Sequence, residues 1–142
     1  MSRSVLLESG PLTFRGGVPV GGWANVAMFP DGHFSFSGHF HNSGAPRYGV
    51  SVVVWIRSKT GRVFAFGISG KMGGLTGGSR DWNFAINKLN SAIKAAWADL
   101  SAGWTGQCHS RVGVDVAGLW RDVKSGAQAV GEVVAVVGPL LV

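Results

Sequence analysis

Hydrophobic and polar residues alternate through the first half of the chain, and turn-forming residues separate the alternating segments. The clearest turn signals are Pro30-Asp31-Gly32 and Lys59-Thr60-Gly61. Strands are predicted over residues 5–14, 23–29, 33–41, 48–57 and 62–68. Short strands at this spacing are typical of an antiparallel meander. Residues 5–68 are therefore predicted to form an antiparallel β-sandwich or small open barrel of about five strands.

In the second half of the chain the apolar residues recur every three or four positions, which indicates helices. One helix is predicted over about 82–100, with Asp81 as its N-cap. A second is predicted over about 116–137, with Asp115 as its N-cap. Residues 104–114 fit either a loop or a short strand. A set of strands followed by helices predicts an α+β fold.

The chain of 142 residues has the length of one domain, and a single domain over residues 1–142 is predicted. Within it we expect a β-rich part over 1–70, a glycine-rich loop over 70–81 and a helical part over 82–142. The start of the chain lacks the apolar core of a secretory signal, so a cytoplasmic location is the default expectation. Secretion by a leaderless route stays open.

Charged residues make up only 14% of the chain, while hydrophobic residues make up 46%. A surface so poor in charge suggests that a ligand, a partner or another copy of the chain covers part of it. The net charge is nevertheless +6, which attracts anionic partners. The basic residues are scattered, and their densest group is Arg57, Lys59 and Arg62 on one turn. This pattern disfavours nucleic acid as a partner.

Three of the four histidines share one face of the strand predicted over 33–41. The phenylalanines of this strand alternate with them and face the other way. His39 and His41 are two residues apart, so they are the candidate ligands for a transition metal. His33 is about 20 Å from His39 along an extended strand and cannot share that metal. A third ligand would have to come from another strand, and the sequence places no acidic residue there; a polar, partly solvated binding face is the alternative.

The glycine-rich loop is the second candidate site. It leads into the helix predicted to begin near residue 82, and a helix N-terminus favours anions. Gly77, Gly78, Ser79 and Arg80 are therefore the predicted anion-binding residues. The alternative is a flexible connection that serves only to place Asp81 as the helix cap.

The third candidate is the apolar stripe of the helix predicted over 116–137. Either this helix closes the core of its own domain, or it packs against the same helix in another copy. Membrane insertion is a further alternative, which the charges of Arg121, Asp122, Lys124 and Glu132 make costly. The predicted self-association residues are Trp120, Val123, Ala127, Val130, Val134 and Val137.

No catalytic constellation is evident, so an enzyme is disfavoured. Cys108 is the only cysteine, and its neighbour His109 would point to the opposite face of a strand. The sequence favours a non-enzymatic binding or self-assembling protein, a homo-oligomer formed through its C-terminal helix, that presents the glycine-rich loop and the histidine face to a ligand. The alternatives are a membrane-active, toxin-like protein and a metal-dependent enzyme using His39 and His41. No cofactor is predicted beyond this open transition-metal site, and the expected partners are an anionic ligand or an anionic membrane.

Overall fold

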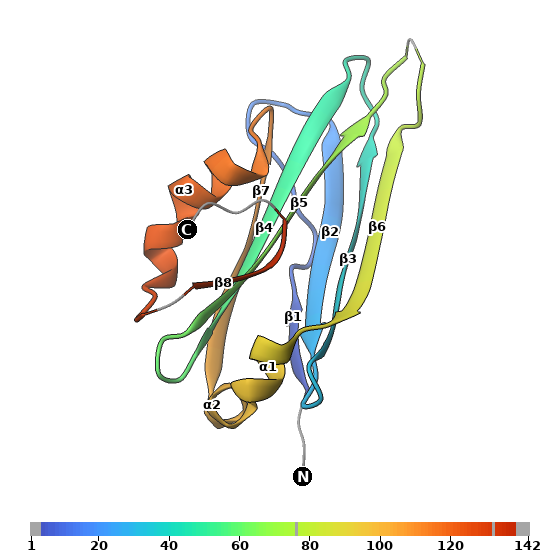
Figure 1. Cartoon of the computed structure of the whole chain (residues 1–142). Coiled ribbons are helices and arrows are strands. Elements are labelled where there is room, and N and C mark those ends of the chain that lie inside the picture. Colours follow the sequence, from blue (N-terminus) through green and yellow to red (C-terminus); the bar gives the residue numbers. More distant parts are fainter. Residues whose placement is uncertain (1–3, 76, 132, 139–142) are drawn as a thin grey trace.

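The computed structural model describes residues 4–75, 77–131 and 133–138 and contains two four-stranded sheets packed face to face (Figure 1). Sheet A has the order β1-β2-β3-β6, and all of its neighbouring strands are antiparallel. Sheet B has the order β7-β4-β5-β8, in which only β8 runs parallel to its neighbour. The strands of sheet A are β1 (Val5–Glu8), β2 (Val20–Met28), β3 (His33–Asn42) and β6 (Asp81–Leu89). Those of sheet B are β4 (Tyr48–Ser58), β5 (Val63–Met72), β7 (Trp104–Val112) and β8 (Val133–Val137).

The main core lies between the two sheets and is rich in aromatic rings. Phe36 on β3 is fully buried, and its ring centroid lies 5.8 Å from that of Phe66 on β5 and 4.9 Å from that of Phe84 on β6. Full burial of one such ring stabilises the fold by roughly 1.5–3 kcal/mol. The alternation that the sequence shows along β3 therefore has its expected cause, because one face of the strand lines this core.

A second core lies on the outer face of sheet B, beneath helix α3 (Val116–Ala127) (Figure 1). Trp55 on β4 and Trp120 on α3 are both buried in it. Since β4 packs against sheet A on one face and α3 on the other, its residues 52–56 form an unbroken apolar run. Among the described residues, no helix combines the length and apolar character needed to cross a lipid bilayer.

Two short helices, α1 (Ser91–Ala95) and α2 (Trp97–Ala102), join β6 to β7 at one end of the sandwich (Figure 1). Asn90 caps α1, because its side chain accepts hydrogen bonds from the backbone N–H groups of Ala92 and Ile93. Ile93 and Leu100 are fully buried in the main core, so these helices close its end.

The β-rich α+β fold is confirmed, but the predicted order of five strands followed by two helices is wrong. The five predicted strands correspond to β1–β5, with β1 ending at Glu8 instead of residue 14. Three further strands, β6, β7 and β8, lie in the part predicted to be helical. The single-domain organisation remains a prediction.

The helix predicted over 82–100 is replaced by β6, α1 and α2. Trp82, Phe84 and Ile86 alternate with polar residues, and the segment pairs with β3 along its whole length. Trp82 lies over Gly70 of β5, where a Cβ atom would come within 2.0 Å of the indole ring. Asp81 is consequently the first residue of a strand and caps no helix.

The helix predicted over 116–137 ends at Ala127, although Asp115 caps it as predicted by accepting a hydrogen bond from the Gly118 N–H. Gln128 adopts a left-handed backbone conformation, with φ 50°, and stops the helix. The valine-rich segment that follows forms β8 beside β5, in keeping with the preference of β-branched residues for strands.

Candidate binding site on the outer face of sheet A

The outer face of sheet A is covered by no other element of the described structure (Figure 1). Its side chains come from alternate positions of four antiparallel strands, so the strand register places them in rows across the sheet. The residues at these outward positions are Leu6 and Glu8 on β1; Gly21, Trp23, Asn25 and Ala27 on β2; His33, Ser35, Ser37, His39 and His41 on β3; and Asp81, Asn83, Ala85, Asn87 and Leu89 on β6.

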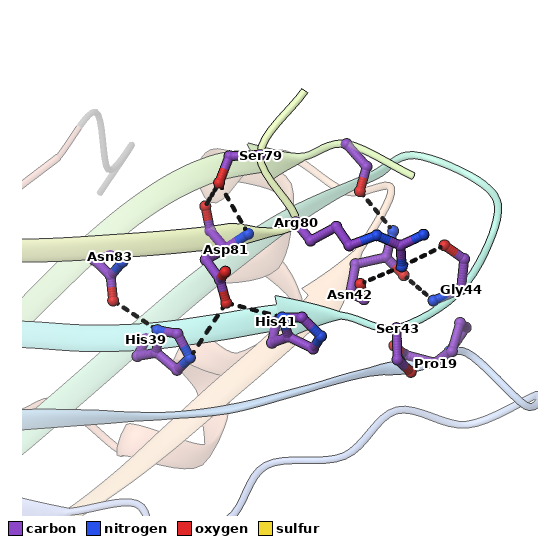
Figure 2. A network of polar contacts seen from close by, with 11 residues as sticks. Pro19, His39, His41, Asn42, Ser43, Gly44, Ser79, Arg80, Asp81 and Asn83 are labelled. Carbon is purple, nitrogen blue, oxygen red and sulfur yellow. Dashed lines mark hydrogen bonds and ion pairs between the residues drawn. The ribbon is translucent and has the colours of Figure 1, made fainter. Parts of the chain in front are cut away.

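His39 and His41 contact polar side chains of the neighbouring strand β6 (Figure 2). The Nδ1 atom of His41 lies 2.8 Å from Oδ1 of Asp81, and the Nδ1 atom of His39 lies 2.6 Å from Oδ1 of Asn83. The Nε2 atom of His39 lies 3.7 Å from the same Asp81 oxygen. The carboxylate of Asp81 therefore stands between the two imidazoles, and the four side chains hold one another in place while remaining open to solvent.

Trp23 completes this cluster from the other side. It pairs with His39 across β2 and β3, and its side chain points away from the main core. The residue keeps 40% of its surface exposed, which is unusual for such a large apolar side chain. We call Trp23, His39, His41, Asp81 and Asn83 the indole–histidine cluster. It joins a flat apolar ring to hydrogen-bonding groups with fixed positions.

A buried polar network holds the strand ends that carry the cluster (Figure 2). The fully buried Asn42 donates from Nδ2 to the carbonyls of Pro46 (2.6 Å) and Gly73 (3.1 Å) and accepts from the Gly44 N–H (2.9 Å). Arg80 donates from Nη1 to the carbonyls of Asn42 (3.0 Å) and Gly44 (3.2 Å). The ends of β3 and β6 are thus tied together next to His41 and Asp81.

His33 lies at the opposite end of β3, where it contacts Asp31 in the turn before the strand. Hydrogen bonds from the backbone and side chain of His33 lower the pKa of Asp31. This end of the face borders a shallow depression that Phe29, Pro30 and Asn87 also line. The separation of His33 from the other two histidines agrees with the sequence analysis.

The expectation that no acidic residue stands near His39 and His41 is wrong, because β6 brings Asp81 between them. The error follows from the predicted helix, in which Asp81 would have been a cap. Even so, the described residues contain no group of three or more His, Cys, Asp and Glu side chains arranged to hold a metal ion.

The glycine-rich loop connects β5 to β6, so the predicted helix N-terminus behind Gly77, Gly78, Ser79 and Arg80 is absent. Arg80 is bound to the carbonyls of Asn42 and Gly44, as described above. Ser79 exchanges hydrogen bonds with the backbone of Asp81, to its carbonyl at 3.0 Å and from its N–H at 3.2 Å. The anion-binding prediction consequently loses its original basis, and Arg80 serves to hold the loop.

The predicted self-association stripe does not lie on one face. Trp120, Val123 and Ala127 are buried against the protein's own sheet B. Val130 lies in the loop after α3 with 62% of its surface exposed, and Val134 and Val137 are on β8, packed against the main core. The stripe spans a helix, a loop and a strand, because the regular spacing continues beyond the residue where the helix stops.

Cys108 and His109 lie on β7 and face opposite sides of sheet B, as the sequence predicts. Burial raises the pKa of the Cys108 thiol to about 12. The thiol therefore stays protonated near neutral pH and has no reactive thiolate character.

The chain matches no protein-family model, no curated protein and no solved structure. What the indole–histidine cluster does is therefore argued from its own chemistry.

Proposed function

We propose that this protein is a non-enzymatic carbohydrate-binding protein, and that the indole–histidine cluster on the outer face of sheet A is its contact surface. One observation carries the proposal. An exposed indole lies beside a row of hydrogen-bonded imidazole, amide and carboxylate groups on a sheet face that no other described element covers.

The two halves of the cluster match the two kinds of surface on a sugar. The face of a pyranose ring presents C–H groups, which pack on the flat π-surface of an indole such as Trp23. The hydroxyl groups at the ring edge both donate and accept hydrogen bonds. Asp81 accepts, while Asn83 and a neutral imidazole do both, so one row of side chains serves several hydroxyls.

The charge of this face supports a neutral ligand. The protein carries a net charge of +6, yet none of the outward positions of the four strands of sheet A holds Lys or Arg. The only charged groups at these positions beside the histidines are Glu8 and Asp81. A face without Lys or Arg offers phosphate-bearing ligands no fixed positive charge, which argues against nucleic acid and anionic membrane as its partners.

The composition of the face also favours a sugar over a protein partner. Protein interfaces are enriched in Arg and Met and depleted in Ser. The centre of this face instead carries Ser35, Ser37 and Asn25, all partly exposed. Hydroxyl and amide groups on an accessible surface suit a ligand that is itself covered with hydroxyls.

The other functions considered from the sequence have less support. Assembly or membrane activity through the C-terminal helix needs an available apolar helix face, and α3 uses its own to cover sheet B. A metal-dependent enzyme needs a ligand group that the described residues do not form. The enzyme alternative also lacks an enclosed site, because the cluster lies on an open sheet face.

Binding to a panel of immobilised neutral glycans and polysaccharides tests the proposal. The wild-type protein should bind at least one of them, and Trp23→Ala should weaken that binding at least tenfold, equal to about 1.4 kcal/mol. Leu89→Ala is the matched control, since Leu89 is also exposed on sheet A but lies at the far end of the face. Binding equally weakened by both variants, or no binding by the folded wild-type protein, would reject the proposal.

A further inference from the structure

A second polar site lies at the end of the sandwich where the β5–β6 hairpin meets the loop between β3 and β4. A pocket of about 510 Å³ lies there. Such a volume is within the range of small-molecule sites, roughly 300–1,000 Å³. It is lined by Arg47, Tyr48, Gly49, Lys71, Met72, Gly73, Gly77, Gly78 and Ser79.

The charge of this pocket differs from that of the outer face of sheet A. Among the described residues that line it, Arg47 and Lys71 are the only charged ones, and none carries a carboxylate. Both cationic side chains are exposed, and neither forms an ion pair or hydrogen bond with any described residue. Asp115 borders the adjoining pocket, where it caps α3. The two cations are therefore available to a ligand.

Glycines form the hairpin side of the pocket. Gly77 and Gly78 have φ values of 135° and 81°, in the region that favours glycine. Neither residue brings a side chain into the pocket, and Gly77 forms an antiparallel bridge with Gly74 across the hairpin. Gly73 is packed against them, since a Cβ atom there would come within 2.0 Å of the Gly77 carbonyl oxygen.

We propose that this pocket binds a tetrahedral oxyanion, namely a phosphate or sulfate group carried by a small molecule. A guanidinium binds two oxygens of such a group at once, and an ammonium adds a second positive charge. The pocket is larger than one ion requires, so there is room for the molecule that carries the group. The site is independent of the carbohydrate proposal, because none of its lining residues belongs to the indole–histidine cluster.

Isothermal titration calorimetry at low ionic strength tests this site, with glucose 6-phosphate and inorganic sulfate as probes and glucose as the uncharged control. The wild-type protein should bind both anions saturably, more weakly as salt is added, and the response to glucose should not depend on Arg47 or Lys71. The double variant Arg47→Ala/Lys71→Ala should weaken anion binding at least tenfold.

The double variant Lys59→Ala/Lys94→Ala is the matched control. It removes the same charge from exposed positions outside the pocket, so it should retain anion binding within about twofold if only screened long-range attraction is lost. An equal loss in both double variants would show that net charge alone attracts the anions and would overturn the proposal. Absence of saturable binding to the folded wild-type protein would do the same, and thermal melting of each variant verifies folding.

Discussion

The outer faces of the two sheets differ in whether a helix covers them. On sheet B, Trp55 of the central strand β4 lies under α3 and keeps only 5% of its surface exposed. On sheet A, Trp23 also points outward, but no described element covers it and 40% of its surface is exposed. The same residue type therefore has two roles, and the presence or absence of a covering helix decides between them.

This difference separates stability from binding. The apolar groups beneath α3 are out of water, so their removal should cost folding free energy. The groups on the outer face of sheet A are already solvated in the folded protein, so their removal should cost little stability. Removal of these groups should instead weaken ligand binding. Substitutions on the two faces should consequently have opposite effects on melting and on binding.

Trp120→Ala should have the largest effect on stability, a loss of about 3–5 kcal/mol, because it leaves a cavity between α3 and sheet B. Trp120→Phe should cost much less. The buried Nε1–H of Trp120 has no acceptor among the described residues, so losing it removes an unpaired donor. Urea unfolding of both variants checks this prediction. Equal losses for Ala and Phe would contradict the account of the second core.

Asn42→Ala should destabilise the protein by about 1–3 kcal/mol, since it leaves part-buried backbone groups of the β3–β4 loop and of the β5–β6 hairpin without their partner. It should also weaken glycan binding, because Asn42 holds the strand end next to His41. Ser43→Ala is the matched control in the same loop, where the hydroxyl is exposed. Urea unfolding gives the stability, and a similar loss for both variants would show that the network has no special role.

The protein should also lose stability at acidic pH through His109, which lies on the covered face of sheet B. Desolvation, and secondarily the positive charge of Arg111, lower the pKa of His109 from its ordinary value of 6.5. The unfolded chain then binds the proton more readily than the folded one, so stability falls as the pH drops below about 6.5 and stops falling once the folded-state pKa is passed. Melting temperatures between pH 7.5 and pH 5 should fall less in His109→Gln than in the wild-type protein. Identical pH profiles would contradict this assignment.

Trp23→Ala should have the smallest effect on stability, within about 1 kcal/mol, because its side chain is largely solvated before and after the change. Urea unfolding beside Trp120→Ala makes the comparison direct. A loss as large as that of Trp120→Ala would mean that Trp23 supports the fold, and its exposure would then have another explanation than binding.

The sequence predicts strands correctly where a single spacing of hydrophobic residues dominates. The alternation along residues 33–41 identifies both the buried phenylalanines and the histidine face, and the apolar run over 48–57 identifies the central strand of sheet B. The prediction fails over residues 82–100, where two spacings compete. Ile86, Leu89 and Ile93 fit a helical spacing. Trp82, Phe84 and Ile86 fit the alternation of a strand. Pairing with β3 decides between the two, and pairing is a long-range property that local spacing does not contain.

Only part of the candidate site can be predicted from the sequence. His39 and His41 are recognisable from one strand alone, but Asp81, Asn83 and Trp23 join them only through the strand register. The same holds for the oxyanion pocket, in which Arg47 and Lys71 come from segments that are far apart in the chain. The alternation of Asn83 and Asn87 with Trp82 and Phe84 was the signal that could have revealed β6.

The most direct test of the central claim is a map of amide and indole chemical shifts on titration with a soluble neutral oligosaccharide that represents a bound member of the glycan panel. If this face binds glycans, shifts are expected in the Trp23 indole and in the outward residues of β2, β3 and β6, with α3 unaffected. Shifts confined to α3 or to the β5–β6 hairpin, with the outer face of sheet A unchanged, would contradict it.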